Sequence, residues 1–308
     1  MSDIREIRRH MESVRDTQKV TGAMHMIAAT KMRHAKEELD STRPYFDAVR
    51  NEIKRVFRVD TTIESRYLYP AGEHDLPGAY AYVVITADRG LAGTYNQTVL
   101  KEAERLAKEH ESMFFVIGEF GRRYFQNKEL DYEKDFVFSA QNPTLQRARI
   151  ITARLLNLYQ EGRVSKIFVI YTDLVSSVAQ QAKLRRILPF HRGDFVIEKK
   201  EKEKKHPFIF YPSVPQVLDN MVESYMTGYI YSALVDSFCC EQSARMNAMD
   251  EASNNAEEIL TDLRRTYNHA RQGKITKEIT EISSGAKALA KRHERKEKLK
   301  QERNTRKK

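Results

Sequence analysis

Residues 86–96 have the composition that comes closest to that of a ligand-binding loop. They read Thr-Ala-Asp-Arg-Gly-Leu-Ala-Gly-Thr-Tyr-Asn, follow an apolar β-branched run and precede a helical stretch. An α/β sheet places its ligand loops at such a junction. A nucleotide-phosphate loop is one interpretation, but the segment matches neither G-x-G-x-x-G nor G-x-x-x-x-G-K-[ST]. We favour a turn and packing motif with Asp88 and Arg89 in local hydrogen bonds. Its members are Asp88, Arg89, Gly90, Gly93 and Asn96.

Two further groups of polar residues lie in helical stretches nearer the end of the chain. Glu241 and Arg245 are four residues apart, a spacing that supports an ion pair on one helix face. The pair is either an ordinary surface pair of little energetic weight or a functional one, and the spacing leaves both open. The second group lies within two helical turns and suits transient, switchable contacts. It comprises Arg271, Gln272, Thr276 and Glu278.

Other catalytic or metal-binding patterns do not assemble. The chain has no Ser/His/Asp order, no H-E-x-x-H and no C-x-x-C, so no cofactor, metal or active site is expected. His25 lacks a second ligand nearby. Cys239 and Cys240 are adjacent, and neighbouring cysteines rarely form an unstrained disulfide. We interpret them as small packed side chains of a protein from a reducing compartment.

The two ends of the chain share a heptad pattern. A helix over residues 4–56 would span roughly 80 Å, which is longer than an ordinary globular domain requires. This period predicts a coiled coil, here an antiparallel pair of terminal helices. The N-terminal positions are Ile4, Ile7, Met11, Val14, Gln18, Thr21, His25, Ala28, Met32, Ala35, Leu39, Thr42, Phe46, Val49, Ile53 and Val56; the C-terminal ones are Met246, Met249, Ser253, Ala256, Leu260, Leu263, Tyr267 and Ala270.

The middle of the chain alternates between strand and helix patterns. This alternation predicts a small α/β domain with a largely parallel sheet. Strands are expected at 79–86, 113–117 and 166–171 with an edge strand at 184–190, and helices at 98–111 and 145–160. The charged run 199–205 is predicted to be a solvated loop.

Three local features modify the long helices. Asp3 or Ser2 is expected to cap the first helix, which continues to about residue 57, and Pro44 should bend it or loosen a turn. The second helix is expected over 214–289. After Ala270 the apolar phase shifts, so the last stretch should face something other than the first helix. The shifted positions are Ile275, Ile279, Ile282, Ala286 and Leu289.

The charge of the chain is unevenly distributed. The net charge is +10, but residues 291–308 hold ten Lys or Arg and three Glu, a net +7, which leaves +3 for the rest. A basic surface over the whole protein, as in many nucleic-acid-binding proteins, is therefore not supported. The tail could bind nucleic acid or acidic lipid by charge, but Glu294, Glu297 and Glu302 interrupt it, which favours an extension without that role. No stretch is apolar enough to span a membrane, and no signal peptide is evident.

Several motifs, in order along the chain, resemble the gamma subunit of the F-type rotary ATP synthase over nearly the whole sequence. The most specific are residues 241–249, Tyr-Asn-His-Ala-Arg-Gln at 267–272, and Ile-Thr-Lys-Glu-Ile-Thr-Glu-Ile at 275–282. Residues 17–24, 26–31, 43–45 and 85–96 match as well.

The resemblance implies α+α/β architecture: a long antiparallel coiled coil of the N- and C-terminal helices with a small inserted Rossmann-like α/β domain. The divisions expected are a coiled-coil helix over 1–58, the α/β domain over 77–210, a second coiled-coil helix over 213–289, and a basic extension over 290–308.

The resemblance also implies a function, that of a central rotor shaft without an active site of its own. The shaft couples rotation of the c ring, driven by ion flow, to ATP synthesis or hydrolysis in the alpha/beta ring. Implied partners are alpha, beta, epsilon and the c ring, with one copy per complex on the cytoplasmic face of a bacterial cell membrane and no nucleic acid. By position, contacts with the ring carry over to Met24, Arg245, Arg271, Gln272, Thr276 and Glu278.

The sequence departs from the family pattern at a few positions. Gly22 replaces a usual Lys, and Tyr211 replaces the carboxylate of the Tyr-x-Tyr-Glu-Pro foot motif, which puts a c-ring contact through that charge in doubt. The tail beyond residue 289 is additional, and a redox-active cysteine insertion is absent. Two alternatives remain: a coiled-coil nucleic-acid-binding protein, based on the tail, and a nucleotide-dependent enzyme in the α/β domain.

Overall fold

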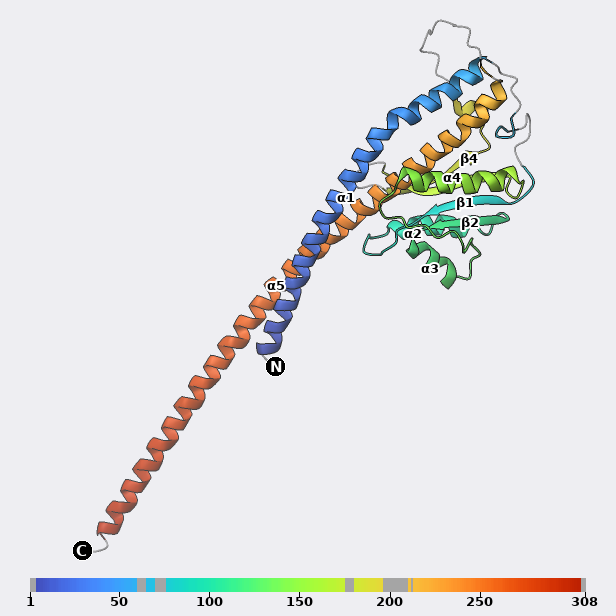
Figure 1. Ribbon diagram of the computed structural model, residues 1–308. Helices are drawn as coiled ribbons and strands as arrows, with labels where there is room; N and C mark the ends of the chain where they lie inside the picture. The colour runs from blue at the N-terminus through green and yellow to red at the C-terminus, as the bar shows by residue number, and fades with distance from the viewer. Residues whose placement is uncertain are drawn as a thin grey trace. The chain divides into compact units, whose positions relative to one another are not determined.

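The computed structural model describes residues 4–59, 65–69, 76–174, 180–195, 210–211 and 213–305 (Figure 1). It divides into two compact units. The domain unit comprises residues 24–249, and the tip unit comprises residues 1–23 and 250–308. Predictions on the cap residues Ser2 and Asp3 and on the charged run 199–205 lie outside the described residues.

A four-stranded sheet forms the centre of the domain unit. Its strands are β1 (Tyr80–Ile85), β2 (Ser112–Ile117), β3 (Lys166–Leu174) and β4 (Gln180–Leu188), in the order β2-β1-β3-β4. β1 pairs in parallel with both β2 and β3, whereas the edge strand β4 is antiparallel to β3. The predicted largely parallel sheet with an added edge strand is therefore confirmed.

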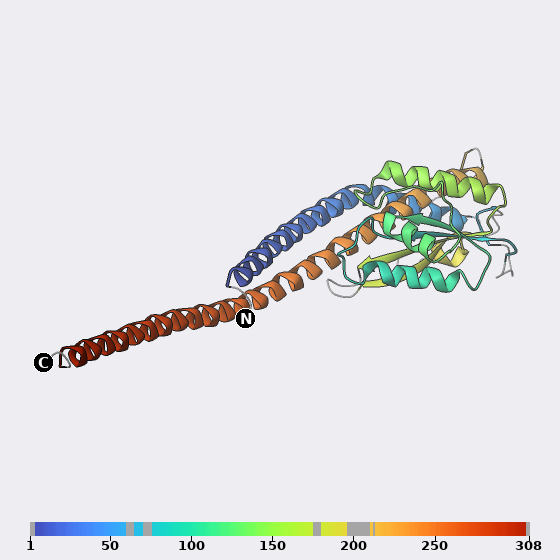
Figure 2. The ribbon, with the colours of Figure 1, turned by 90° about the horizontal axis from the view of Figure 1, so that it is seen from below.

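Helices cover both faces of this sheet (Figure 2). On one face, Val99 and Leu100 of α2 (Tyr95–Leu106) and Phe125 of α3 (Glu119–Asn127) pack on the outer sides of β1 and β2. On the other face, α4 (Leu145–Gln160) packs against the sheet together with α5 (Val214–Thr305). The sequence predicted α4 and a helix near α2, but not α3 or the short 3-10 helix η1 (Arg192–Phe195).

Within the domain unit, α1 (Ile4–Val59) and α5 run antiparallel, because residues later in α1 contact residues earlier in α5. The Met32 carbonyl accepts a bond from the Cys239 thiol at 3.9 Å, and the Phe46 ring lies against Gly228. A Cβ added at Gly228 would lie 2.2 Å from Phe46 Cδ1, so the glycine permits this close approach. α1 remains helical through Pro44, so the proline does not interrupt it.

The heptad prediction holds along both helices. Every one of the predicted seam positions on α1 and α5 is buried or half-buried. Cys239 and Cys240 are buried and form no disulfide, as expected of packed side chains. Burial raises the pKa of their thiols to about 11 and about 12, respectively.

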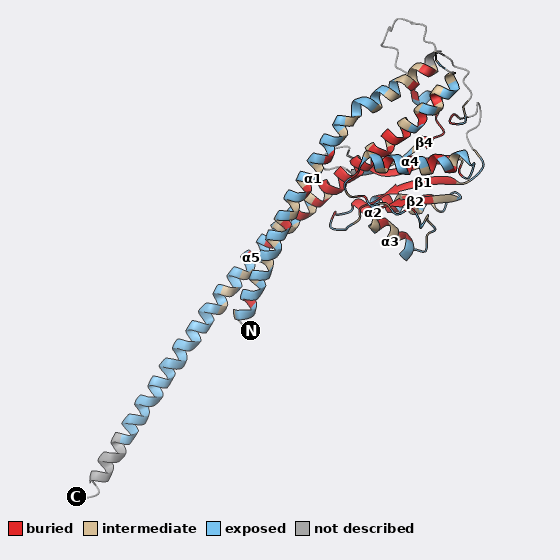
Figure 3. Ribbon diagram, viewed as in Figure 1, coloured by how far each residue is buried: buried red, intermediate tan, exposed pale blue. Residues whose placement is uncertain are grey.

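In the tip unit, the two helical segments bury one another's apolar residues only over part of their length. Ile7 of α1 and Ala256 and Leu260 of α5 are buried. From residue 271 to residue 296, by contrast, every residue of α5 is exposed (Figure 3). The sequence predicted that the phase-shifted stretch would not pack on the first helix, and its exposure confirms this prediction.

Candidate functional site

The loop of residues 86–96 lies at the carboxyl end of β1, the central strand of the parallel part of the sheet. The chain leaves β1 through this loop and α2 to form β2 on one side, and later returns to form β3 on the other side. The crevice at such a switch point is where open α/β sheets bind their ligands. We therefore ask whether side chains of the protein itself fill this crevice or leave it open to a ligand.

The Asp88 carboxylate lies in the loop after β1, at the carboxyl end of the sheet. It accepts hydrogen bonds from the Glu119 N–H at the start of α3 (3.0 Å), from the Ala140 and Gln141 N–H groups (3.1 and 3.2 Å) and from the Ser139 hydroxyl. Burial acts to raise the pKa of Asp88, but these hydrogen bonds outweigh it and the pKa lies below its usual value. A fixed negative charge at the amino end of a helix takes the place that a phosphate would need.

The strand ends around this loop are also closely packed. Thr86 Oγ1 donates to the Ile117 carbonyl at 2.8 Å and accepts from the Gly121 N–H at 3.0 Å. Gly118 has φ 96°, and a Cβ there would lie 2.3 Å from the Thr86 carbonyl oxygen. Backbone therefore meets backbone where a dinucleotide fold would leave room for a ligand.

The remaining residues of the predicted motif divide between buried and exposed positions. Asn96 is buried and accepts a 2.8 Å hydrogen bond from the Ala87 N–H, which closes the loop. Gly93 has φ 53°, a left-handed conformation that favours glycine. The Gly90 carbonyl accepts a hydrogen bond from Arg245. Arg89 differs from the expectation, because it is exposed and makes no hydrogen bond or ion pair with any residue that the structure describes.

A buried ion pair on α5 holds this loop against the long helix. Glu241 and Arg245 lie 2.7 Å apart, with side chains only 1% and 10% exposed, so the surface-pair interpretation was wrong. Arg245 Nη2 also donates to the Gly90 carbonyl at 3.1 Å. Burial raises the pKa of Glu241, and the Arg245 guanidinium acts against that shift.

Gln141 extends this network to α1. Its Nε2 lies 3.4 Å from Glu241 Oε1, and its Oε1 lies 3.4 Å from Lys31 Nζ on α1. The Arg147 guanidinium on α4 fixes the same loop by donating to the Ser139 and Gln141 carbonyls at 2.9 and 2.7 Å. We call the set Lys31, Asp88, Gly90, Gln141, Glu241 and Arg245 the junction, because it joins both long helices to the α/β domain.

The sequence patterns pointed to Asp88, Gly90, Glu241 and Arg245 but not to the residues that connect them. Ser139, Gln141 and Arg147 belong to no motif, and their partners lie up to about a hundred residues away. Lys31 is the last residue of the motif 26–31, which is part of the family resemblance. That motif was the one feature of the sequence that could have pointed to Lys31.

The residues predicted to contact a ring lie in different environments. Met24 on α1 is half-buried, and Arg245 is held in the junction. The other four are exposed within two turns of α5 in the tip unit. There the Thr276 hydroxyl donates to the Gln272 carbonyl at 3.0 Å and Glu278 pairs with Lys274 at 3.9 Å, both local contacts that leave these side chains accessible.

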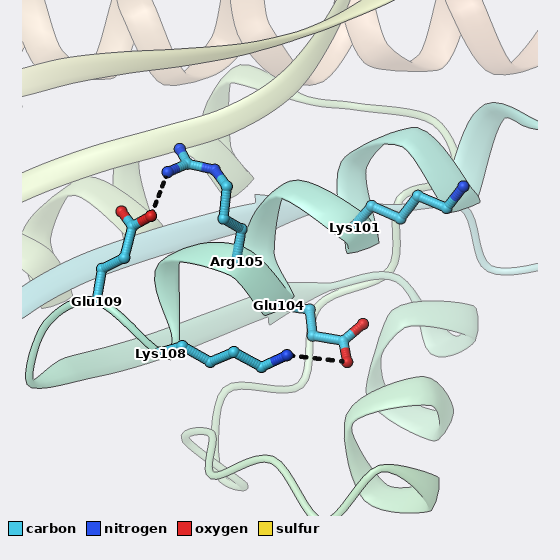
Figure 4. A pocket seen from close by; sticks show the side chains of 5 residues that line it. All are labelled: Lys101, Glu104, Arg105, Lys108 and Glu109. Carbon is cyan, nitrogen blue, oxygen red and sulfur yellow. Dashed lines mark hydrogen bonds and ion pairs between the residues drawn. The ribbon is translucent and has the colours of Figure 1, made fainter.

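A hollow lies beside α2 and the turn that follows it, and it is lined by Lys101, Glu104, Arg105, Lys108 and Glu109. Figure 4 shows this charged lining, in which side chains of α2 pair with those of the turn after it. Arg105 pairs with Glu109 at 2.6 Å and Lys108 with Glu104 at 3.9 Å. Such i,i+4 pairs are characteristic of a solvated helix face. Across the described residues, no helix is both long and apolar enough to cross a bilayer.

Comparisons with known proteins agree on one family. The family model described as ATP synthase matches residues 3–289. The ATP synthase gamma chain of Ruminiclostridium cellulolyticum is 35% identical over 94% of this chain and 99% of its own length. That of Caldanaerobacter subterraneus subsp. tengcongensis is 37% identical over 92% of this chain and 98% of its own length.

Solved structures show the same fold. A chain of the Euglena gracilis mitochondrial ATP synthase in rotational state 3 matches with a TM-score of 0.61 at 17% identity, covering 93% of this chain and 94% of its own. A chain of the Tetrahymena thermophila central stalk and c ring matches with a TM-score of 0.57 at 24% identity, covering 76% and 99%. With the family model over most of its length and relatives more than a third identical end to end, this chain belongs to the family of ATP synthase gamma chains.

Proposed function

We propose that this chain is the central-stalk shaft of an F-type ATP synthase. It couples rotation of the c ring, driven by ion flow, to ATP synthesis or hydrolysis in the alpha/beta ring. Its role is mechanical: the shaft favours different conformations of the surrounding catalytic subunits as it turns. Catalysis itself lies on beta.

The exposed end of α5 is the observation that carries this proposal. Over residues 271–296 a single helix is exposed on all sides, and Ile275, Ile279 and Ile282 are 47%, 61% and 73% exposed. A helix that exposes large apolar side chains gains stability when another surface covers them. Because exposure extends around the whole helix, a partner that encloses it accounts for this better than one that docks on one face.

The junction supplies the second requirement of a shaft, which is stiffness under load. Gln141 bonds to Lys31 of α1 and to Glu241 of α5, and Arg245 bonds to the loop after β1. A load on the α/β domain therefore reaches both helices through hydrogen-bonded side chains. Asp88 stabilises the same loop through backbone N–H groups. The switch point of this sheet is thus used for mechanical attachment instead of nucleotide binding.

The partners and location follow from this role. Alpha and beta enclose the tip, epsilon and the c ring attach at the α/β domain, and one copy serves each complex. The chain lies on the cytoplasmic face of a bacterial cell membrane and reaches that membrane through the c ring. Met24, Arg271, Gln272, Thr276 and Glu278 are the proposed ring contacts. Arg245 belongs to the same proposal, and it also acts from within the junction.

Copurification from native membranes tests the proposal. Tagged chain, extracted in mild detergent, should bring down alpha, beta, epsilon and c subunits together, as identified by mass spectrometry. Replacing Ile275 and Ile279 by Asp should release alpha and beta, whereas replacing both by Leu should retain them. Recovery of the wild-type chain alone, or with nucleic-acid-binding proteins, would contradict the proposal.

A further inference from the structure

The last turns of α5 extend beyond the part of the chain that the family model matches. The match ends at residue 289, whereas α5 continues to Thr305. Residues 286–305 contain neither Gly nor Pro, the residues that most often break or kink a helix. Sixteen further residues at about 1.5 Å each lengthen the helix by roughly 24 Å. This extension is continuous with the helix that precedes it.

The chemistry of α5 changes at the same point. Upstream, exposed lysines are neutralised within the helix, as in the Lys274–Glu278 and Lys277–Glu281 pairs, both at 3.9 Å. Downstream, Lys291, Arg292, Arg295 and Lys296 are exposed, and none forms an ion pair with a described residue. The apolar positions end at Leu289, and beyond Ala290 the only large aliphatic residue is Leu299. The extension therefore offers charge where the preceding turns offer apolar surface.

We propose that residues 290–305 form an electrostatic extension of the shaft, which binds an acidic protein surface of the same complex beyond the end of the apolar contact. This inference rests on the proposed function. It adds a second contact of different chemistry, since the preceding turns present the exposed isoleucines and the described side chains of the extension include the exposed cations Lys291, Arg292, Arg295 and Lys296.

Two observations favour a protein surface of the complex over nucleic acid or lipid. First, the extension is a continuation of α5, so its position along the helix axis is set by whatever encloses the preceding turns. A flexible basic arm, by contrast, could reach polymers or membranes freely. Second, Glu294, Glu297 and Glu302 alternate with the cations, which lowers the charge density that phosphate backbones favour.

Charge is also a suitable chemistry for a contact that must turn. The attraction between exposed charges extends over about 8 Å at physiological ionic strength and does not depend on close fit. Because this attraction needs no interlocking side chains, the extension can rotate against an acidic surface without breaking a closely fitted contact.

Site-specific photo-crosslinking in the purified complex tests the inference. A photoactivatable amino acid is placed at Arg295 in the extension and, as the matched control, at Ile282 in the apolar stretch. The Arg295 position should crosslink to a subunit segment rich in Asp and Glu. That yield should fall several-fold when salt is raised from about 0.1 M to about 1 M, where the Debye length shrinks from about 10 Å to about 3 Å. The Ile282 yield should not change.

A charge variant provides an independent measurement. Replacing the Lys and Arg of residues 291–308 by Gln should reduce the Arg295-position crosslink at low salt and leave the Ile282-position crosslink intact. Crosslinks from Arg295 to lipid or nucleic acid, or to a protein with no salt dependence, would overturn the inference alone. Absence of alpha or beta crosslinks at Ile282 would overturn the proposed function itself.

Discussion

Arg245 Nη2 of α5 donates a hydrogen bond of 3.1 Å to the Gly90 carbonyl, in the loop that follows β1. The same guanidinium neutralises the buried Glu241 carboxylate. One side chain thus balances a charge inside the protein and attaches a long helix to the α/β domain.

Arg245→Met should therefore destabilise the full-length chain strongly. The substitution leaves Glu241 buried without its counter-charge, and removing one partner of a buried pair costs about 3–5 kcal/mol. Thermal unfolding followed by circular dichroism measures the effect. Arg265→Met provides the matched control on the same helix, because Arg265 and Asp262 are 75% and 76% exposed at 3.3 Å and should contribute nothing measurable.

A second variant identifies the cause of the loss. In Glu241→Gln/Arg245→Met no carboxylate remains to be neutralised, so part of the lost stability should return. If the double variant is as unstable as Arg245→Met, uncompensated charge is not the reason and the hydrogen bond to Gly90 carries the effect.

Gly228→Ala should also destabilise, although alanine is the better helix former. Its Cβ would lie 2.2 Å from Phe46 Cδ1, so the two helices must separate or the ring must move. Overpacking of this kind costs about 1–3 kcal/mol, and with a contact this short we expect it to outweigh the gain of about 1 kcal/mol in helix propensity. Gly273→Ala on the same helix meets no atom within 4 Å, so thermal unfolding should show unchanged or slightly increased stability. Equal responses at the two glycines would contradict this account.

How much of this structure the sequence predicts depends on the range of each interaction. The heptad positions follow from local spacing, and every predicted seam residue of α1 and α5 is buried or half-buried. The strands were recognised because buried parallel strands are continuous apolar runs. β1, for example, reads Tyr-Ala-Tyr-Val-Val-Ile.

The parts that were missed depend on distant partners. α3 has nine residues, begins after Gly118 and buries only Gly121 and Phe125, so its helical pattern is weak. Gln141 lies two residues before Pro143 in a loop and belongs to no motif. It nevertheless bonds to residues 100 and 110 positions away. Glu241 and Arg245 have the spacing of a surface pair, but the pair is buried where it meets Gly90 and Gln141 in the loops of the α/β domain. Burial of a polar pair is set by the tertiary fold and cannot be read from spacing.

Met24→Lys should impair coupling in the assembled enzyme. Met24 is half-buried on α1, and its flexible apolar side chain suits a contact that slides. A lysine there would add a cation able to form a strong, misplaced bond to an acidic neighbour. Inverted membrane vesicles should retain ATP hydrolysis but pump fewer ions per ATP, whereas Met24→Leu should match wild type. Unchanged pumping in the lysine variant would exclude Met24 as a contact that affects rotation.

Asp236 makes stability depend on pH in a direction opposite to that of most carboxylates. It lies on α5, where burial, followed by the nearby Asp173 carboxylate, raises its pKa to about 6 despite the opposing charges of Arg43 and Lys183. In the unfolded chain its pKa is about 4. Because the folded state holds this proton more tightly, Asp236 contributes most below pH 4, and that contribution is lost as the pH rises through about 6. The loss is on the order of 3 kcal/mol.

Asp236→Asn removes this titration and keeps the shape of the side chain. Asp88, whose pKa is lowered, gives the reverse slope in both proteins, so the difference between variant and wild type isolates Asp236. The melting temperature of Asp236→Asn relative to wild type should increase between about pH 4 and pH 6 and then level off, because the amide stays neutral where the carboxylate ionises. A difference that stays constant across this range would mean that Asp236 is already ionised at pH 4 and that Arg43 and Lys183 outweigh its burial.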